Sequence, residues 1–170
     1  MSGAAVWHAP AHPAEAMGWR DVTWLRMDTP SNRMVIHWVA FLQHAPDMAQ
    51  LDALVRQRLL AYPRFAQRVR RGVLGYRWVP VAQLDPHYHL QERVLQQPVD
   101  TAAVEACLAE WVPQALDRER PLWQWRLLRS EAGGAAALIV RHHHCMTDGD
   151  GLVHMLRHLS DETAQAAPPP

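Results

Sequence analysis

The stretch "AAALIVRHHHCMTDGDGL", residues 135–152, decides the fold of this chain. Its apolar first half runs straight into three histidines, which predicts a buried strand over residues 135–144. Side chains alternate along a strand, so His142 and His144 share one face while His143 points to the other. The three histidines are therefore not equivalent.

The predicted strand is followed by a loop that carries Asp148 and Gly149. Loops at strand ends are common sites of function. A histidine at this position is suited to act as a general base, because the unperturbed pKa of histidine is about 6.5. Asp148 could orient the loop or an imidazole, and Gly149 permits backbone conformations that other residues avoid.

Two other interpretations of the histidines stay open on the residues alone. His142 and His144 together with Asp148 form a plausible metal-ligand set, although a fourth ligand is not evident. The simpler interpretation is structural, with the histidines forming a solvated edge or hydrogen-bonded core groups.

Composition bounds the class of protein. The chain has 170 residues, of which 49% are hydrophobic, enough for one domain with a core. Lys+Arg and Asp+Glu both number 17, so the formal net charge is zero and a nucleic-acid partner is not expected. The two cysteines form no framework, and neither a signal peptide nor a transmembrane run is recognisable. We expect a cytoplasmic protein whose membrane contact, if any, is peripheral.

Five segments besides the histidine strand are predicted to be strands or extended chain. Residues 32–43 are apolar on both faces, which predicts a buried central strand. Residues 64–71 and 75–81 are predicted as short strands, and residues 87–97 as a weaker extended segment. Residues 123–129 are predicted as a strand that Gly133 and Gly134 connect to the histidine strand.

Helical periodicity marks the remaining elements. A short helix is expected before Pro30 and a longer one from Asp47 to Pro63, with Gln50 completing a capping box. Asp100 begins another helix, and leucines at 152, 156 and 159 mark the last. Mixed strands and helices predict an α/β or α+β fold with a mixed sheet. The predicted units are a flexible tail over 1–16, a domain over 17–162 and a Pro-rich tail or linker over 163–170.

Four motifs then resemble one family. The segment "HHCMTDG", residues 143–149, is similar to the HHxxxDG motif of the bacterial wax ester synthase/acyl-CoA:diacylglycerol acyltransferases. The segments "RPLW" (120–123), "WRDVTWLRMDTP" (19–30) and "YPRFAQRV" (62–69) resemble further elements of that family. HHxxxDG alone is shared with condensation domains, chloramphenicol acetyltransferase-like enzymes and plant acyltransferases. The Pro-Leu-Trp and Asp-Thr-Pro elements favour the wax ester synthases.

The chain also departs from the family pattern. Met27 stands where a leucine is usual, and Met34-Val35-Ile36 replaces a frequent Met-His-Val. Family members continue into a second domain of similar fold with an Asn-Asp motif, which this sequence lacks.

The resemblance implies half of a chloramphenicol acetyltransferase-like fold, a two-layer α+β sandwich in which helices flank a mixed sheet. It implies O-acyl transfer from long-chain acyl-CoA to a fatty alcohol or diacylglycerol, with acyl-CoA as substrate and no cofactor or metal. His144 would be the general base and His143 a structural residue. Asp148 would hold the loop by pairing with an arginine, Arg141 or another, and Gly149 would serve the turn.

Other residues carry weaker expectations. Pro121, Leu122 and Trp123 could bind substrate along an acyl tunnel, although core packing would explain the two apolar side chains as well. Cys145 lies in the variable part of HHxxxDG and is not expected to be a nucleophile. An arginine group could meet CoA phosphates or anionic lipid headgroups, against the commoner solvated edge: Arg64, Arg68, Arg70, Arg71 and Arg77.

Two alternatives to a complete enzyme remain. The chain could be a catalytically incomplete half that binds a second acyltransferase domain or chain. It could also be another HHxxxDG acyltransferase with a different acceptor. Contact with a membrane or lipid droplet is a further expectation of the resemblance.

Overall fold

A four-stranded mixed sheet forms the centre of the molecule in the computed structural model, which describes residues 6–147, 151, 153, 155 and 158–159. The strand order is β3-β9-β8-β7, with β9 antiparallel to both of its neighbours and β7 parallel to β8. The bounds are β3 (Val35–Leu42), β7 (Leu90–Leu95), β8 (Trp123–Ser130) and β9 (Ala136–His143). The predicted α/β fold with a mixed sheet is confirmed.

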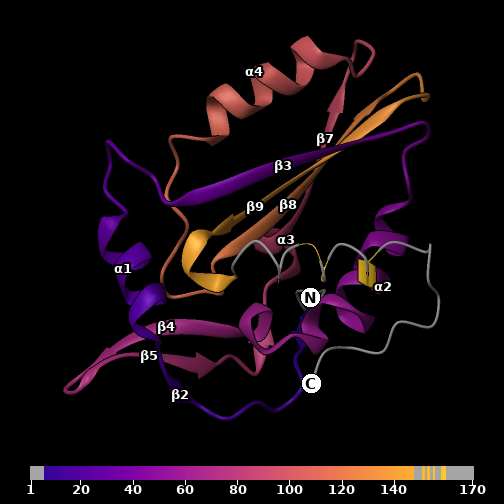
Figure 1. Cartoon of the computed structure of the whole chain (residues 1–170). Coiled ribbons are helices and arrows are strands. Elements are labelled where there is room, and N and C mark those ends of the chain that lie inside the picture. The colour runs from indigo at the N-terminus through magenta and orange to yellow at the C-terminus, as the bar shows by residue number, and fades with distance from the viewer. Residues whose placement is uncertain (1–5, 148–150, 152, 154, 156–157, 160–170) are drawn as a thin grey trace, which may run out of the picture.

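Helices lie on both faces of this sheet (Figure 1). Helix α4 (Thr101–Trp111) covers one face, where Val104, Cys107 and Trp111 pack on Ala137 and Ile139 of β9. It also connects β7 to β8, as a parallel pair requires a crossover. On the other face, Leu51 and Val55 of α2 (Met48–Gln57) belong to the larger core.

The predicted helix starts are confirmed by their capping contacts. The side chain of Gln50 accepts the Asp47 N–H at 3.0 Å, and the Asp100 carboxylate accepts the Ala103 N–H at 2.9 Å. Both contacts satisfy N–H groups that a helix start leaves without intrahelical partners.

Short elements complete the larger core. Strand β2 adds to a β5–β4 hairpin, and β1 pairs with β6. Their bounds, with those of the remaining elements, are β1 (Trp7–His8), β2 (Glu15–Ala16), α1 (Trp19–Met27), η1 (Leu59–Ala61), η2 (Pro63–Ala66), β4 (Gln67–Gly72), β5 (Gly75–Pro80), β6 (Gln83–Leu84), α3 (Pro86–His89) and η3 (His144–Met146).

The prediction of a flexible tail over residues 1–16 is wrong for residues 7–16. Trp7 is only 2% exposed, and its ring stacks on Trp123 with centroids 6.3 Å apart. Trp7 anchors the segment together with the pairing of β1 with β6 and of β2 with β5. Burial of one tryptophan side chain is worth several methylene groups. Residues 163–170 lie outside the described part of the chain.

Two further predictions need correction. Strand β3 is half-buried at the edge of the sheet, not central, and Phe41 is 60% exposed. The apolar pattern of a strand indicates that both faces of its sheet are covered. It does not indicate whether other strands pair with both of its edges. The helix expected to reach Pro63 ends at Gln57, and Arg58 is its C-cap residue. A 3₁₀ turn continues from there.

The last predicted helix lies only partly within the described residues. Gly151, Val153, Met155, His158 and Leu159 have helical geometry, and Met155 is buried in the larger core. Among the residues that the structure describes, no helix is long and apolar enough to cross a membrane.

Candidate active site at the end of strand β9

The histidine motif sits where β9 leaves the sheet. The strand ends at His143, and His144 begins the η3 turn. The backbone N–H of His143 donates to the Leu122 carbonyl at 2.9 Å, and that of His144 donates to the Met34 carbonyl at 2.7 Å. The segment before β8 and the segment before β3 therefore fix the motif from both sides.

The His144 ring lies against helix α1. It stacks on Trp24 with ring centroids 3.9 Å apart and an interplanar angle of 19°. The side chain is half-buried, and its Nδ1 has no hydrogen-bond partner among the described residues. The ring faces a pocket of about 310 Å³ that is lined by Arg20, Asp21, Trp24, Arg64, His144, Met146 and Thr147. The Nδ1 atom is buried, so a bound group could reach only the other edge of the ring. A flat ring held by stacking at the wall of a pocket is arranged to exchange a proton with such a group.

His143 is a structural member of the turn by its contacts. Its Nδ1 accepts the backbone N–H of Cys145 at 3.1 Å, and its Nε2 lies 4.0 Å from Oδ2 of Asp28. Burial lowers the pKa of His143 to about 4, although Asp28 opposes this shift. The neutral ring therefore carries its proton on Nε2, toward the carboxylate.

Asp28, from the Asp-Thr-Pro signature, links several segments around this turn. Its Oδ1 accepts the Met34 N–H at 3.1 Å, and its Oδ2 meets Arg118 at 3.3 Å and Arg33 at 3.7 Å. The carboxylate lies beside the Nε2 of His143. Sequence reasoning used this aspartate only as part of a resemblance and gave it no role.

His142 is a core residue. It is fully buried, and neither ring nitrogen has a hydrogen-bond partner among the described residues. Burial, followed by the nearby His144, His143 and His37, lowers its pKa to about 4. In the part of the chain that the structure describes, no three His, Cys, Asp or Glu side chains are grouped to hold a metal ion. The ligand set that included Asp148 lies partly outside those residues.

The remaining motif residues divide between the core and the undescribed segment. Cys145 is buried, and burial raises the pKa of its thiol, which disfavours the nucleophilic thiolate. Asp148 and Gly149 lie outside the described residues, so their roles stay predictions. Arg141, one suggested partner of Asp148, donates to Gln124 and to carbonyls at the end of α4.

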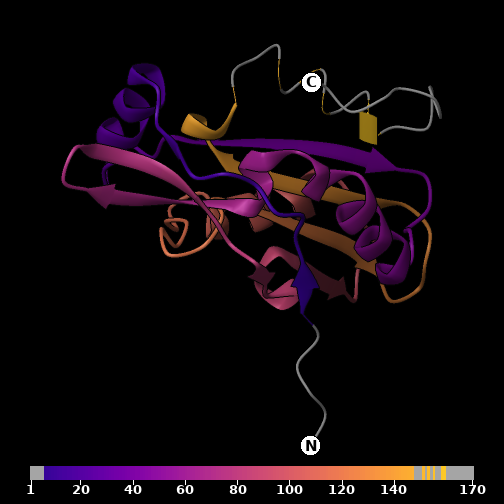
Figure 2. The same ribbon diagram turned by 90° about the horizontal axis from the view of Figure 1, so that it is seen from below.

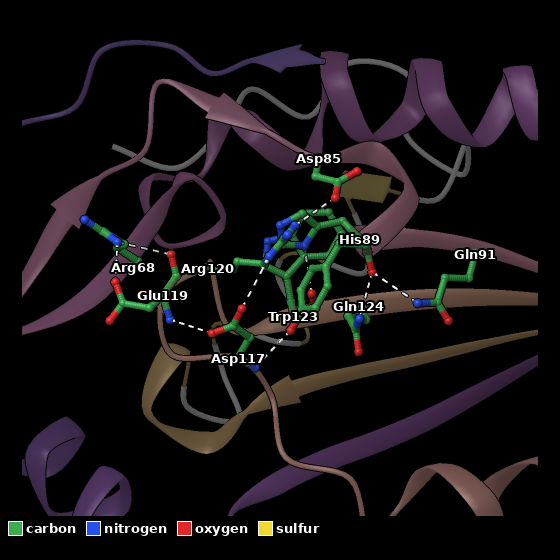
Figure 3. A network of polar contacts seen from close by, with 10 residues as sticks. Arg68, Asp85, His89, Gln91, Asp117, Glu119, Arg120, Trp123 and Gln124 are labelled. Atoms are coloured by element: carbon green, nitrogen blue, oxygen red, sulfur yellow. Dashed lines mark hydrogen bonds and ion pairs between the residues drawn. The ribbon is translucent and has the colours of Figure 1, made fainter. Parts of the chain in front are cut away.

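The Pro-Leu-Trp residues do not line the pocket of His144. Leu122 and Trp123 are fully buried, and the Trp123 indole N–H donates to the Phe65 carbonyl at 2.9 Å. Pro121 lines a separate pocket of about 440 Å³, near Arg120 and the stacked pair of Trp123 and His89 (Figure 3). In the structure these residues support the backbone of the histidine motif, because the Leu122 carbonyl accepts the N–H of His143.

Three residues of α1 that line the pocket were missed from the sequence: Arg20, Asp21 and Trp24. Arg20 and Trp24 stand four residues apart and both line the pocket. The i, i+4 spacing was available in the sequence. The contact of Trp24 with His144 depends on the tertiary fold, which brings α1 against η3 from the far end of the chain.

Solved structures define the class of fold. The wax ester synthase/diacylglycerol acyltransferase of Marinobacter aquaeolei VT8 superposes with a TM-score of 0.73 at 24% identity, over 92% of this chain and 39% of that chain. The starter condensation domain of rhizomide synthetase gives 0.70 at 20% identity, over 87% and 36%. The fold is therefore one half of a chloramphenicol acetyltransferase-like fold, the class of the HHxxxDG proteins.

The sequence comparisons are more specific. The model of the wax ester synthase/diacylglycerol acyltransferase catalytic domain matches residues 17–170, and the chain belongs to that family. A probable diacylglycerol O-acyltransferase of Mycobacterium tuberculosis is 32% identical over 122 residues, which are 70% of this chain and 26% of that protein. Another M. tuberculosis protein with a diacylglycerol O-acyltransferase name is 29% identical over 149 residues, 82% of this chain and 29% of its own length. The chain thus spans about a quarter of the length of these relatives.

Proposed function

We propose that this chain is the N-terminal domain of an O-acyltransferase that moves a long-chain acyl group from acyl-CoA to a fatty alcohol or diacylglycerol. The observation that carries the proposal is the His144 ring, which is stacked on Trp24 and lines the pocket. Family membership supports the reaction type, and the complex of a related condensation fold with C8-CoA supports the acyl donor.

In the proposed reaction, a His144 ring nitrogen takes the proton of the acceptor hydroxyl. The hydroxyl oxygen attacks the thioester carbonyl, the carbon–sulfur bond breaks, and CoA leaves as the thiolate, which recovers the proton. General base catalysis of this kind contributes roughly 10²–10⁴-fold. His143, Asp28 and the Leu122 carbonyl hold the turn, so the imidazole is oriented before substrate arrives.

The size of the pocket suggests that a second domain completes the site. Its volume of about 310 Å³ is at the lower end for a drug-sized ligand and far below the size of an acyl-CoA. We infer that a second acyltransferase domain, on the same chain or another, closes over His144 and supplies the rest of the acyl path. Acyl-CoA is then a substrate, and no cofactor is needed.

The test compares wild type with His144→Ala in this domain joined to or co-expressed with a second domain. Wild type should form wax ester or triacylglycerol from acyl-CoA, and His144→Ala should reduce the rate by at least about 100-fold. His44→Ala, at an exposed histidine, is the matched control and should keep full activity. Turnover retained in His144→Ala would exclude this base.

The second candidate function is a catalytically incomplete half that serves only to bind its partner domain. The observation that favours it is the pocket at His144, which at about 310 Å³ is far too small for an acyl-CoA. Purified chain that is monomeric and turns over acyl-CoA with an alcohol would exclude this alternative. Turnover of the assembled two-domain protein that is unchanged in His144→Ala would support it, because this chain would then contribute no base.

A further inference from the structure

The tip of the β4–β5 hairpin exposes two neighbouring apolar side chains. Val73 and Leu74 are fully solvent-exposed, at 103% and 102% of their reference areas. The hairpin projects beyond the body of the molecule, beside α1, in both views (Figures 1 and 2). Tight hairpin turns favour Asn, Asp and Gly, so a Val-Leu pair at this position is not explained by turn geometry, which Gly75 accommodates with φ 120°.

A third exposed apolar side chain follows the segment that pairs with this hairpin. The N–H of Met17 donates to the Tyr76 carbonyl at 3.0 Å. This bond attaches the segment just before α1 to the hairpin, at the residue after Gly75. Trp19 follows two residues after Met17 and is 76% exposed, with the Arg20 guanidinium 5.5 Å from its ring centroid. Exposed tryptophan and leucine beside arginine are the residue types of interfacial membrane contacts.

The same region concentrates positive charge in a chain with zero net charge. The sequence has no aspartate or glutamate between Asp52 and Asp85. Arg70 and Arg77 stand directly opposite each other across the two strands, an arrangement that destabilises an isolated hairpin. Arg70, Arg71 and Arg77 are exposed, and no carboxylate pairs with them among the described residues. An anionic surface would relieve this repulsion.

We infer that this tip, formed by Val73, Leu74, Trp19, Arg70, Arg71 and Arg77, docks on an anionic lipid bilayer. The apolar side chains would enter the interface, and the arginines would meet lipid phosphates. Arg20 lies beside Trp19 and also lines the pocket of His144, so docking would place that pocket near the membrane surface. The inference goes beyond the proposed function and does not require it, since binding involves no turnover.

Vesicle sedimentation with this chain tests the inference directly. Wild type should bind vesicles of phosphatidylcholine with phosphatidylglycerol, more weakly at high salt. The double variant Val73→Ser/Leu74→Ser should bind at least about ten-fold more weakly. Phe41→Ser, which alters an exposed apolar residue on β3, should bind as wild type does. Equal binding by the tip variant and wild type, or a lack of binding by folded wild type, would overturn the inference.

The contribution of the arginines to vesicle binding can be measured separately from that of the apolar side chains. Arg70→Gln/Arg71→Gln should weaken binding about five-fold per arginine on anionic vesicles and little on pure phosphatidylcholine. Arg56→Gln/Arg129→Gln removes the same charge elsewhere on the surface and should have a much smaller effect. Equal losses in the two double variants would mean that net charge, and not this tip, drives binding, and would count against the inference.

A fluorescent label distinguishes lipid contact from protein contact. Cys107 and Cys145 are buried, so a thiol reagent should label Leu74→Cys selectively. An environment-sensitive label on that residue should shift to shorter wavelength when anionic vesicles are added, and the same label on Phe41→Cys should not. A shift that follows protein concentration without vesicles would identify a contact between copies of the chain and overturn the lipid assignment.

Discussion

Two tryptophan–histidine stacks in this molecule have nearly the same geometry and opposite settings. Trp24 and His144 stack with centroids 3.9 Å apart at 19°, and Trp123 and His89 stack at 4.3 Å and 28°. His89 is buried, its Nδ1 is bound to the Trp123 carbonyl at 2.9 Å, and burial lowers its pKa to about 4 (Figure 3). His144 is half-buried and faces a pocket.

The difference teaches that stacking fixes a histidine without deciding its chemistry. In the Trp123–His89 stack, the carbonyl oxygen accepts a hydrogen bond from Nδ1–H, so the tautomer is fixed and the pair is part of the core. In the Trp24–His144 stack, no hydrogen bond to Nδ1 among the described residues fixes the tautomer, and the ring lines a pocket. The first stack should therefore control stability and the second should control turnover.

Truncation of the core tryptophan should have the largest effect. Trp123→Ala should reduce the free energy of unfolding by about 3–5 kcal/mol, because it removes a fully buried ring that contacts Trp7, Phe65 and His89. Chemical denaturation monitored by circular dichroism measures the loss. Trp24→Ala, at a half-buried position, should cost about 1 kcal/mol. Similar losses in both variants would remove the distinction between the stacks.

The second largest effect should be a loss of fold stability in acid, caused by the buried histidines. His89, His142 and His143 each have a folded-state pKa of about 4, below the unfolded value of about 6.5. The unfolded chain binds more protons in this window, so stability is full above pH 6.5 and falls as the pH decreases toward 4. The loss from pH 7 to pH 5 should be on the order of 1–2 kcal/mol per histidine.

The variant His89→Asn isolates one of these contributions. It should lower stability at pH 7, because the stack is lost, and flatten the decline between pH 7 and pH 5. Denaturant titrations at the two pH values give both quantities. An unchanged decline would show that His89 is not neutral in the folded protein.

A smaller effect is expected when the Trp24–His144 stack alone is disturbed. Trp24→Leu keeps an apolar side chain but removes the flat surface that holds the His144 ring. Activity of the assembled two-domain protein should fall about ten-fold, in line with lost positioning of a general base. Thermal stability should change by only a few degrees. Full activity would mean that the stack does not orient the ring.

The fold was largely predictable because local signals agree with the packing. The apolar run before the histidines became β9, with every residue from Ala136 to His143 buried, and Asp47 and Asp100 began the helices they were expected to begin. The position of β3 at the edge of the sheet and the anchoring of residues 7–16 were not predictable from the sequence. The pattern of β3 reports its two faces, and Trp7 is an isolated signal in a polar, proline-containing segment.

The candidate site was predictable only in part. The motif identified His144 and separated it from His143, but Trp24 and Asp28 reach the motif through tertiary contacts that periodicity does not encode. The Pro-Leu-Trp element suggested a substrate wall, yet Leu122 and Trp123 are core residues by burial. An apolar motif near a catalytic motif can support the backbone as readily as it can bind a ligand.

The smallest expected effect concerns the thiol beside the candidate base. Cys145 follows His144 directly, but it is 2% exposed and burial raises the pKa of its thiol. Cys145→Ala should therefore leave the turnover of the assembled protein within about two-fold and cost about 1 kcal/mol of stability, as expected for a small buried side chain. Turnover and denaturation assays on the same preparation measure both. A large loss of turnover with unchanged stability would assign Cys145 a chemical role. Its position beside His144 would then matter more than the burial of its thiol.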